Sequence, residues 1–289
     1  MKVITRIGEL QKNIDHVKKT GASIGFVPTM GYLHEGHLTL VKEARNDSDI
    51  VVMSIFVNPL QFGPDEDFDR YPRDVERDTA LANGAGVDIL FIPEVEEMYS
   101  GQQSITLTVK ERVEVMCGRK REGHFDGVVT VLTKLFHLVQ PNRAYFGQKD
   151  AQQVAVVEGL VSDYFFPVDI VRVSTVREGD GLAKSSRNVY LSDKERKEAP
   201  ALYRSLEEVK KKIEEGERKP STIISLITTY IQENTSGNID YVEVYSYPKL
   251  MELDLLEGEI IIALAVQFQQ ARLIDNSIIS VETEEDSNV

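Results

Sequence analysis

Short apolar runs alternate along the first part of the chain with stretches in which apolar residues recur at helical spacing. The apolar runs, which predict strands, are residues 24–27, 49–57, 87–92, 143–146 and 168–173. The stretches of helical spacing, which predict helices, are residues 4–17, 38–44, 72–85, 128–139 and 152–164. Strands that alternate with helices in this way, and that are apolar almost throughout, predict a parallel α/β sheet covered on both faces.

The pattern changes after about residue 185. Ser192, with Glu195 three residues on, matches a capping box, and we expect the helix that starts there to continue to about residue 213. The remaining predicted elements are a helix at residues 219–232 and strands at residues 239–247, 260–268 and 278–281. Helices followed by antiparallel strands predict a small α+β domain.

Two domains are therefore expected. The first, over residues 1–184, carries the parallel sheet, and the second, over residues 185–289, is a smaller α+β lid domain. A length of 289 residues suits such a division. The tail from residue 282 onward is acidic and polar, and we expect it to be frayed.

Composition and charge exclude several classes of function. The net charge of −14 argues against a broad surface for nucleic acid or membrane, so neither is expected as a partner. An anionic ligand must then be held by a few well-placed cations. Cys117 is the single cysteine, so an intrachain disulfide cannot form, which fits a reducing compartment. Because the sequence shows no export signal and no long apolar span, we expect a cytoplasmic protein.

The first candidate chemistry follows the apolar run at residues 24–27. Pro28 is expected to end that strand, because proline cannot donate to the ladder, and Gly31 permits a tight turn. The helix start that follows would aim free backbone N–H groups at the carboxyl edge of the sheet, where phosphates bind in open α/β folds. His34 and His37 would share one face there and could hydrogen-bond a phosphate or give it a proton. An ordinary helix start with two surface histidines explains this stretch about equally well.

Two further clusters carry cations. Gly147 and Lys149 lie where another predicted strand passes into a helix, a geometry that suits phosphate. Lys184 and Arg187 flank two serines in a glycine-led loop at residues 181–188, which is typical of a phosphate-binding lid. A solvated turn and a polar interdomain linker are the plainer alternatives for these two clusters.

Amide side chains could recognise a small polar substrate. Gln61 follows the apolar strand at residues 49–57, and Gln153 lies one turn into the helix after Lys149; each offers a donor and an acceptor. Surface glutamines are the alternative for both. The histidines at positions 16 and 137 are expected to be structural, and the one at position 124 receives no role. The cysteine has no partner at metal-ligand spacing, so no zinc site is expected.

Taken together, these clusters resemble a known family. The string His34-Glu35-Gly36-His37 resembles the HxGH form of the HIGH motif of nucleotidyltransferases, and Lys184-Ser185-Ser186-Arg187 resembles their KMSKS-type loop. The longer strings that resemble the pantoate–β-alanine ligase family are residues 28–37, 56–63, 146–153 and 180–188. The resemblance covers about residues 23–192. Gln148 stands where many members carry glutamate, a change that a backbone contact to phosphate would tolerate.

The resemblance implies a Rossmann-like parallel sheet of the nucleotidyltransferase type, with a smaller α+β C-terminal domain. It implies a reaction in two halves: pantoate and ATP give pantoyl adenylate and pyrophosphate, and β-alanine then displaces AMP to give pantothenate. It also implies Mg²⁺ as a cofactor with ATP, and a homodimer. No covalent enzyme intermediate is implied, and no serine or cysteine in the chain has an evident paired base.

The resemblance also assigns site residues. Catalytic roles fall on His37, expected to be the proton donor, and on His34, Lys149 and Arg187. The ATP site would comprise Met30, Gly31, Tyr32, Leu33, His34, Glu35, Gly36, His37, Gly147, Gln148, Lys149, Asp150, the backbone at Val176, Lys184, Ser185, Ser186 and Arg187. Gln61 would contact pantoate and β-alanine, and Gln153 would contact pantoate. The magnesium ligands and any base for β-alanine are not assigned.

Three other functions share part of this pattern. Another HxGH nucleotidyltransferase could act on a different small acceptor, but the two glutamines suit a hydroxy acid better than a phosphorylated acceptor. An aminoacyl-tRNA synthetase shares both motifs, but the acidic charge and the lack of an anticodon-binding extension speak against it. A nucleotide-binding protein without turnover would bind ATP and release no pyrophosphate.

Overall fold

The computed structural model describes residues 1–282 except residues 65, 67 and 102. The described chain forms two compact units. The first consists of Met1–Val113 and Cys117–Ser174, and the second of Glu114–Met116 and the described residues from Thr175 onward. Within the second unit, the backbone N–H of Met116 donates to the Glu243 carboxylate at 2.9 Å. The boundary expected after residue 184 falls inside the second unit.

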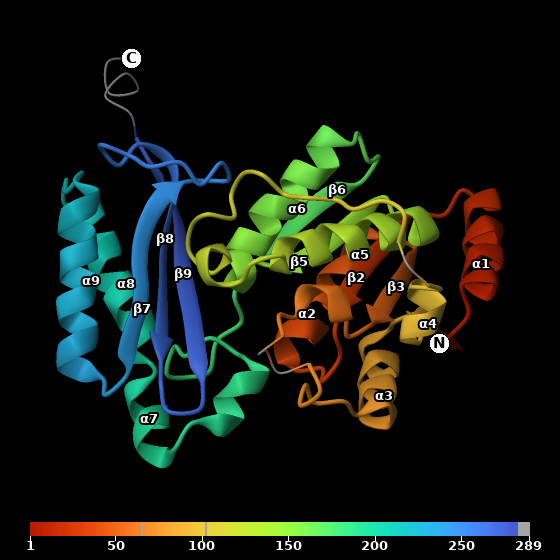
Figure 1. Cartoon of the computed structure of the whole chain (residues 1–289), viewed down its shortest axis with the longest axis horizontal. Helices are drawn as coiled ribbons and strands as arrows, with labels where there is room; N and C mark the ends of the chain where they lie inside the picture. The colour runs from red at the N-terminus through yellow and green to blue at the C-terminus, as the bar shows by residue number, and fades with distance from the viewer. Residues whose placement is uncertain (65, 67, 102, 283–289) are drawn as a thin grey trace. The chain divides into compact units, whose positions relative to one another are not determined.

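The first unit is built on a parallel sheet of six strands in the order β1-β4-β3-β2-β5-β6 (Figure 1). The strands are β1 (Lys2–Ile4), β2 (Ile24–Thr29), β3 (Ile50–Ile55), β4 (Ile89–Phe91), β5 (Arg143–Gly147) and β6 (Asp169–Val173). All of their pairings are parallel, so the predicted parallel α/β sheet is confirmed. The predicted helix at residues 4–17 begins later than expected. The three residues of β1 precede it as an edge strand too short to show a period.

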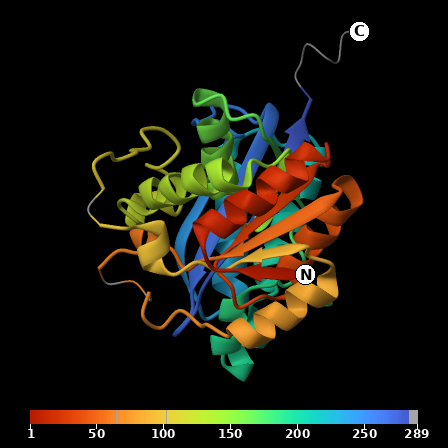
Figure 2. The same ribbon diagram turned by 90° about the vertical axis from the view of Figure 1, so that its right-hand side faces the viewer.

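Helices cover both faces of this sheet. They are α1 (Ile7–Lys19), α2 (Glu35–Asp47), α3 (Val75–Ala85), α4 (Val95–Met98), α5 (His124–Val139) and α6 (Ala151–Asp163). Phe26 packs on the side of α1 and α5, whereas its neighbour Val27 packs on the side of α2 and α3. Figure 2 shows α1 and α5 on one face and α3 on the other. Successive residues of a strand point to opposite faces, so a wholly apolar run is what such a two-sided burial requires.

The expectation that Pro28 ends its strand is wrong, because β2 continues through Pro28 to Thr29. The carbonyl of Thr29 accepts the N–H of Phe56 after β3. Backbone groups alternate along a strand, so the Pro28 nitrogen faces β5, where the pairing with β2 has already ended at Phe26. Proline therefore costs no ladder hydrogen bond at this position.

The strand order reverses direction between β2 and β5. From β2 the chain proceeds outward through β3 and β4, and later from β5 to β6 on the other side. Ligands of open α/β sheets bind outside the carboxyl ends of the strands at such a topological switch point. The loops that follow β2, β3 and β5 therefore occupy the position at which a site is expected.

The second unit carries an antiparallel sheet of three strands, β7 (Asn238–Ser246), β8 (Gly258–Gln267) and β9 (Arg272–Val281). Its helices are α7 (Asp193–Glu198), α8 (Ala201–Glu214) and α9 (Pro220–Asn234), and Figure 1 shows α8 and α9 beside this sheet. The small α+β fold is confirmed. None of the helices formed by the described residues combines the length and apolar character that crossing a membrane requires.

Two element predictions in the second unit are corrected. The capping box at Ser192 is present, but the helix it starts ends at Glu198, and α8 begins after Pro200. Proline has no N–H to donate within the preceding helix, which explains the break. The predicted strand at residues 278–281 is the end of the ten-residue strand β9. Its earlier part was missed because it carries polar residues, among them the buried Asp275, which binds Arg177.

Candidate active site

Three of the clusters singled out in the sequence meet at the carboxyl edge of the first unit's sheet. They follow the neighbouring strands β3, β2 and β5. The amide nitrogen of Gln61, after β3, donates to Sδ of Met30, after β2, at 3.0 Å. Lys149 and Asp150, after β5, act electrostatically on His37 at the start of α2. The alternation of strands and helices therefore brings members of the three clusters together.

The two histidines form one hydrogen-bonded pair at the start of α2. His34 is the N-cap residue, and its Nδ1 accepts the backbone N–H of Gly36 at 3.1 Å. The backbone N–H of His34 in turn donates to Nδ1 of His37 at 3.3 Å, and the ring centroids lie 4.1 Å apart. Because a backbone N–H can only donate, each Nδ1 acts as an acceptor, which leaves the proton of the neutral ring on Nε2. Both rings thus present an Nε2–H donor.

His37 is neutral in this environment. Burial, the neighbouring His34 and the Lys149 cation together lower its pKa to about 3, against an opposing effect of Asp150. Desolvation disfavours the charged form of imidazole, and nearby cations add to this effect. The neutral ring can act as a hydrogen-bond donor through Nε2–H, and the role of His37 as a proton donor stays a prediction.

The backbone N–H groups before α2 are already engaged. The carboxylate of Asp78, on α3, accepts the N–H of Tyr32 at 2.6 Å and that of Leu33 at 2.8 Å. The N–H of Gly31 donates to the Thr29 hydroxyl at 3.3 Å. The expectation that this turn offers free N–H groups to a phosphate is therefore wrong for these three residues. These three N–H groups are therefore not offered to a phosphate, whereas the dipole of α2 still favours an anion at this end of the helix.

Asp78 and its neighbour Arg77 hold the turn in an uncommon conformation. Gly31 and Tyr32 both have positive φ, of 87° and 49°. The Asp78 side chain is almost completely buried, at 2% exposure, and accepts from Arg77 at 3.3 Å. Arg77 also donates to the Leu33 carbonyl at 2.9 Å, and its guanidinium lies over the Tyr32 ring at 5.2 Å. Sequence reasoning missed this pair, since nothing local distinguishes it from other charged residues of α3.

Hydrogen bonds to both its side chain and its backbone hold Gln61 in place. It ends the 3-10 turn η1 (Pro59–Gln61) and is 7% exposed. Its Oε1 accepts from Nδ2 of Asn58 at 3.2 Å, and its carbonyl accepts from Nδ1 of His124 at 2.8 Å. The Cβ of an alanine at position 127 would lie 2.3 Å from the Leu60 carbonyl oxygen, so Gly127 of α5 lets this turn approach.

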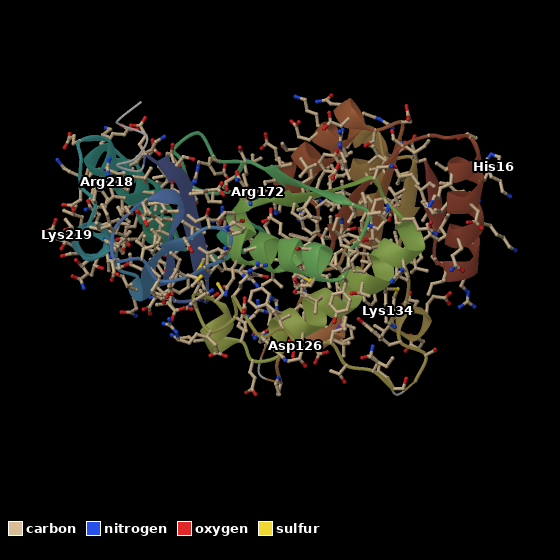
Figure 3. The ribbon with its side chains drawn as sticks, turned by 90° about the horizontal axis from the view of Figure 1, so that it is seen from above. His16, Asp126, Lys134, Arg172, Arg218 and Lys219 are labelled. Atoms are coloured by element: carbon tan, nitrogen blue, oxygen red, sulfur yellow. The ribbon has the colours of Figure 1, made fainter. Side chains whose placement is uncertain are left out.

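His124, which received no role in the sequence analysis, belongs to this support. A carbonyl oxygen only accepts, so Nδ1 of His124 carries the proton, and Nε2 accepts from Arg121 at 3.0 Å. Arg121 also pairs with Glu66 at 2.6 Å. Burial and the Arg121 cation lower the pKa of His124 to about 4. The histidines at positions 16 and 137 are exposed on α1 and α5, and Figure 3 shows His16 at the outer side of α1.

The cluster after β5 forms a 3-10 turn, η3 (Gln148–Asp150), which leads directly into α6. The Lys149 side chain is 19% exposed and lies 3.9 Å from the Asp150 carboxylate. The two neighbouring glutamines of α6 differ. Gln152 is buried and accepts the N–H of Cys117 at 2.9 Å, so it has a structural role, whereas Gln153 is only half-buried.

The second unit carries the predicted cationic loop. Lys184 pairs with Glu178 at 3.3 Å, and its N–H donates to the carbonyl of Val176 at 2.8 Å. The Ser185 side chain accepts the N–H of Arg187 at 3.2 Å and thereby caps the 3-10 turn η4 (Ser186–Tyr190). The loop is thus a defined turn in which the predicted lysine contacts a carboxylate.

A dedicated metal site is not formed by protein side chains in the described part of the chain, where no group of three or more His, Cys, Asp or Glu residues is placed to hold a metal ion. A magnesium ion usually keeps several waters and needs only one or two carboxylates beside substrate phosphates. Asp150, whose side chain is 55% exposed, is the carboxylate of this kind next to Lys149. The residues present therefore fit a metal that arrives with a phosphate ligand.

A parallel sheet with a switch point, a histidine pair at its carboxyl edge and a lysine in the turn after the adjoining strand are typical of a nucleotide-binding enzyme of the HIGH-motif class. Within that class the chain belongs to the pantoate–β-alanine ligase family, whose model matches residues 2–278. The resemblance drawn from the motifs is thereby confirmed, and the chain is an enzyme of the ligase type.

Relatives that match nearly the whole chain support this family assignment. A pantothenate synthetase of Geobacillus sp. (strain WCH70) is 62% identical over 97% of this chain and 100% of its own length. The crystal structure of pantothenate synthetase from Thermus thermophilus superposes with a TM-score of 0.90 at 45% identity, covering 98% of this chain and 100% of that one. A pantoate–β-alanine ligase from Francisella tularensis, solved with β-γ ATP and β-alanine, has a TM-score of 0.77 at 31% identity, covering 96% and 97%.

Proposed function

We propose that the chain joins pantoate to β-alanine at the expense of ATP, by way of pantoyl adenylate. In the first step a carboxylate oxygen of pantoate bonds to the α-phosphorus, and the bond from that phosphorus to the bridging oxygen breaks, which releases pyrophosphate. In the second step the amine of β-alanine bonds to the acyl carbon, and AMP leaves with the oxygen that came from pantoate. The amine loses its protons to solvent or phosphate.

The observation that carries this proposal is the histidine pair at the switch point. Two anions must approach each other in the first step, and negative charge moves onto pyrophosphate as the α-phosphorus is attacked. Catalysis then depends on positioning and on donors fixed in advance. The Nε2–H groups of His34 and His37, which are held by backbone hydrogen bonds, are such donors. Lys149 supplies positive charge from the turn that follows β5.

The ATP site follows from the same resemblance. In the first unit it comprises residues 30–37 and 147–150. In this unit side chains, rather than the N–H groups of residues 31–33, contact the phosphates, because those N–H groups already have acceptors. In the second unit the resemblance assigns Lys184, Ser185, Ser186, Arg187 and the backbone at Val176 to the nucleotide. Lys184 then exchanges Glu178 for a phosphate oxygen.

Pantoate is assigned to the two glutamines. Gln61 would contact pantoate and then β-alanine, and Gln153, half-buried in the first turn of α6, would contact pantoate. Asp150 is the carboxylate that would hold a magnesium ion bound with ATP, and that ion would neutralise phosphate charge. A lid role for the second unit and a homodimer stay predictions. Light scattering of the purified protein tests the dimer.

The deciding experiment follows the oxygen atoms. Pantoate labelled with ¹⁸O in its carboxylate is incubated with the enzyme, Mg²⁺-ATP and β-alanine, and the products are analysed by mass spectrometry. We expect one ¹⁸O in AMP, and pyrophosphate release that depends on pantoate. Label in inorganic phosphate with ADP formation would show an acyl phosphate and refute the adenylate. Pyrophosphate release without pantoate would refute the substrate assignment.

A further inference from the structure

We infer that Tyr99 is a positioning residue for substrate recognition: together with the Leu60 N–H and the Gly127 carbonyl, its hydroxyl holds the Asn58 side chain, and Asn58 fixes which end of the Gln61 side-chain amide faces the substrate. This inference rests on the proposed function of Gln61 as a pantoate contact. Tyr99 is the residue that follows the last turn of α4, and it belongs to none of the motifs described above.

Asn58 is the connecting residue, and all of its hydrogen-bonding capacity is used. It is 1% exposed, so no water competes for its side chain. Its Oδ1 accepts the Tyr99 hydroxyl at 2.8 Å and the N–H of Leu60 at 3.3 Å. Its Nδ2 donates to the carbonyl of Gly127 at 3.0 Å and to Oε1 of Gln61 at 3.2 Å. A buried amide with two acceptors and two donors satisfied has a single orientation.

The orientation of the Asn58 amide determines the orientation of the Gln61 amide. The Leu60 N–H can only donate and the Gly127 carbonyl can only accept, so Oδ1 and Nδ2 of Asn58 cannot exchange places. Nδ2 therefore donates to Gln61, and the Gln61 atom that receives the hydrogen bond must be its oxygen. The NH₂ group of Gln61 is left to face Met30 and the site.

The orientation matters because the proposed substrate is an anion rich in acceptors. An NH₂ group donates to a carboxylate or to a hydroxyl oxygen, whereas an amide oxygen in the same place would repel the carboxylate. Turning the Gln61 amide over would also place its NH₂ group against the NH₂ group of Asn58. The hydrogen bonds of Asn58 thus select the donor end of Gln61 for the substrate.

Tyr99 is itself firmly placed. Its ring packs beside Phe56, with centroids 6.1 Å apart, and Nζ of Lys134 lies over the ring at 4.6 Å. Lys134, labelled on α5 in Figure 3, also donates to the carbonyl of Met98 at 2.7 Å. Burial raises the pKa of Tyr99 well above its ordinary value, so the hydroxyl keeps the proton that it donates. Its hydrogen bond to Asn58 is therefore present throughout the range in which the enzyme can be assayed.

The variant Tyr99→Phe removes this hydroxyl and keeps the ring. We expect the KM for pantoate to rise roughly three- to tenfold, the usual consequence of losing one net hydrogen bond, with kcat and the KM for ATP within about twofold of wild type. The matched control is Tyr164→Phe, since the Tyr164 side chain is exposed at the end of α6. Thermal unfolding of both variants checks that they are folded.

A double-mutant cycle separates this role from a general structural one. In the Gln61→Ala background, Tyr99→Phe should no longer change the KM for pantoate, because the group it positions is gone. If Gln61→Ala raises that KM but Tyr99→Phe has no effect, or has the same effect in both backgrounds, the inference about Tyr99 is overturned and the proposed function stands. If Gln61→Ala leaves that KM unchanged, the assignment of Gln61 to pantoate fails instead.

Discussion

The carboxylate of Asp78 accepts the backbone N–H of Leu33 at 2.8 Å, although 45 positions separate the two residues in sequence. The same carboxylate accepts the N–H of Tyr32. The turn that precedes the histidine pair is therefore shaped by a side chain of α3, a helix that the chain forms only after α2 and β3. The position of the histidine pair depends on this one buried carboxylate.

Asp78→Asn should lower both stability and activity. The amide replaces one acceptor oxygen with an NH₂ group, which faces a backbone N–H, so a buried donor loses its partner. We expect the free energy of unfolding to fall by about 1–3 kcal/mol and kcat to fall with it. Urea denaturation and steady-state kinetics measure the two effects. Glu76→Gln, at an exposed position of the same helix, is the control. A variant indistinguishable from this control would contradict the role of Asp78.

His37→Ala should lower kcat while ATP still binds. Removing one preorganised donor to a developing negative charge typically costs about 2.7–4 kcal/mol, or roughly 10²–10³ in kcat. His37→Gln should retain part of the activity, because the amide nitrogen of glutamine can occupy the position of Nε2 and the ring is neutral in the free protein. Nucleotide affinity is measured separately by calorimetry. Near-normal turnover in His37→Ala would remove this residue from the mechanism.

Gly127→Ala should displace the turn that carries Gln61. The added Cβ would lie 2.3 Å from the carbonyl oxygen of Leu60 and 2.6 Å from the Gln61 nitrogen, both of which are backbone atoms. We expect the melting temperature to fall and the KM for pantoate to rise more than the KM for ATP. Gly84→Ala is the matched control, since its Cβ would meet nothing within 4 Å in α3, and it should stabilise by about 0.4–1 kcal/mol. Equal melting temperatures for the two variants would show that α5 and the turn do not pack as described.

Acid should destabilise the protein partly through His37 and His124, whose pKa values are lowered in the folded state. The unfolded chain protonates histidine near pH 6.5, whereas the folded protein does so only near pH 3 for His37 and pH 4 for His124. Between these pH values the unfolded state binds more protons than the folded state. The contribution of the two neutral histidines to the free energy of unfolding is therefore fully present above pH 6.5 and is lost as the pH falls toward 4.

The variant His124→Asn tests this dependence. Asparagine can keep the hydrogen bond to the Gln61 carbonyl and does not titrate. The slope of unfolding free energy against pH between 6.5 and 4 should be smaller than in wild type by up to about 1.4 kcal/mol per pH unit. Urea denaturation at several pH values measures the slope. The same slope in both proteins would mean that His124 titrates normally in the folded state.

The sequence predicts the sheet, the histidine pair and the loop lysine because each depends on neighbours in the chain. An apolar run makes a buried strand, and a spacing of three brings His34 and His37 together at a helix start. The second unit was predicted in outline. The helix break at Pro200 was not predicted, because it depends on backbone hydrogen bonds. The polar start of β9 was not recognised as a strand, because Asp275 is buried there only with Arg177 as its partner.

The features of the fold and the site that the sequence does not predict depend on contacts between residues far apart in sequence. Asp78, Tyr99 and His124 lie on different parts of the chain, and their relation to the loops after β2 and β3 exists only once the sheet has formed. The N–H groups expected to be free before α2 were misjudged for this reason. Pro28 was misjudged because only the pairing of β2 on each side reveals that its nitrogen needs no acceptor.

The hydrogen bond from Met116 to Glu243 has a consequence for the order in which the protein is made. The two residues are 127 positions apart, and residues 114–116 leave the ribosome long before β7 is synthesised. This part of the second unit therefore waits, without its carboxylate partner, until the chain is nearly finished. A gene divided after codon 174 would leave residues 114–116 on the product that holds the whole first unit, so the other product would lack this part of the second unit.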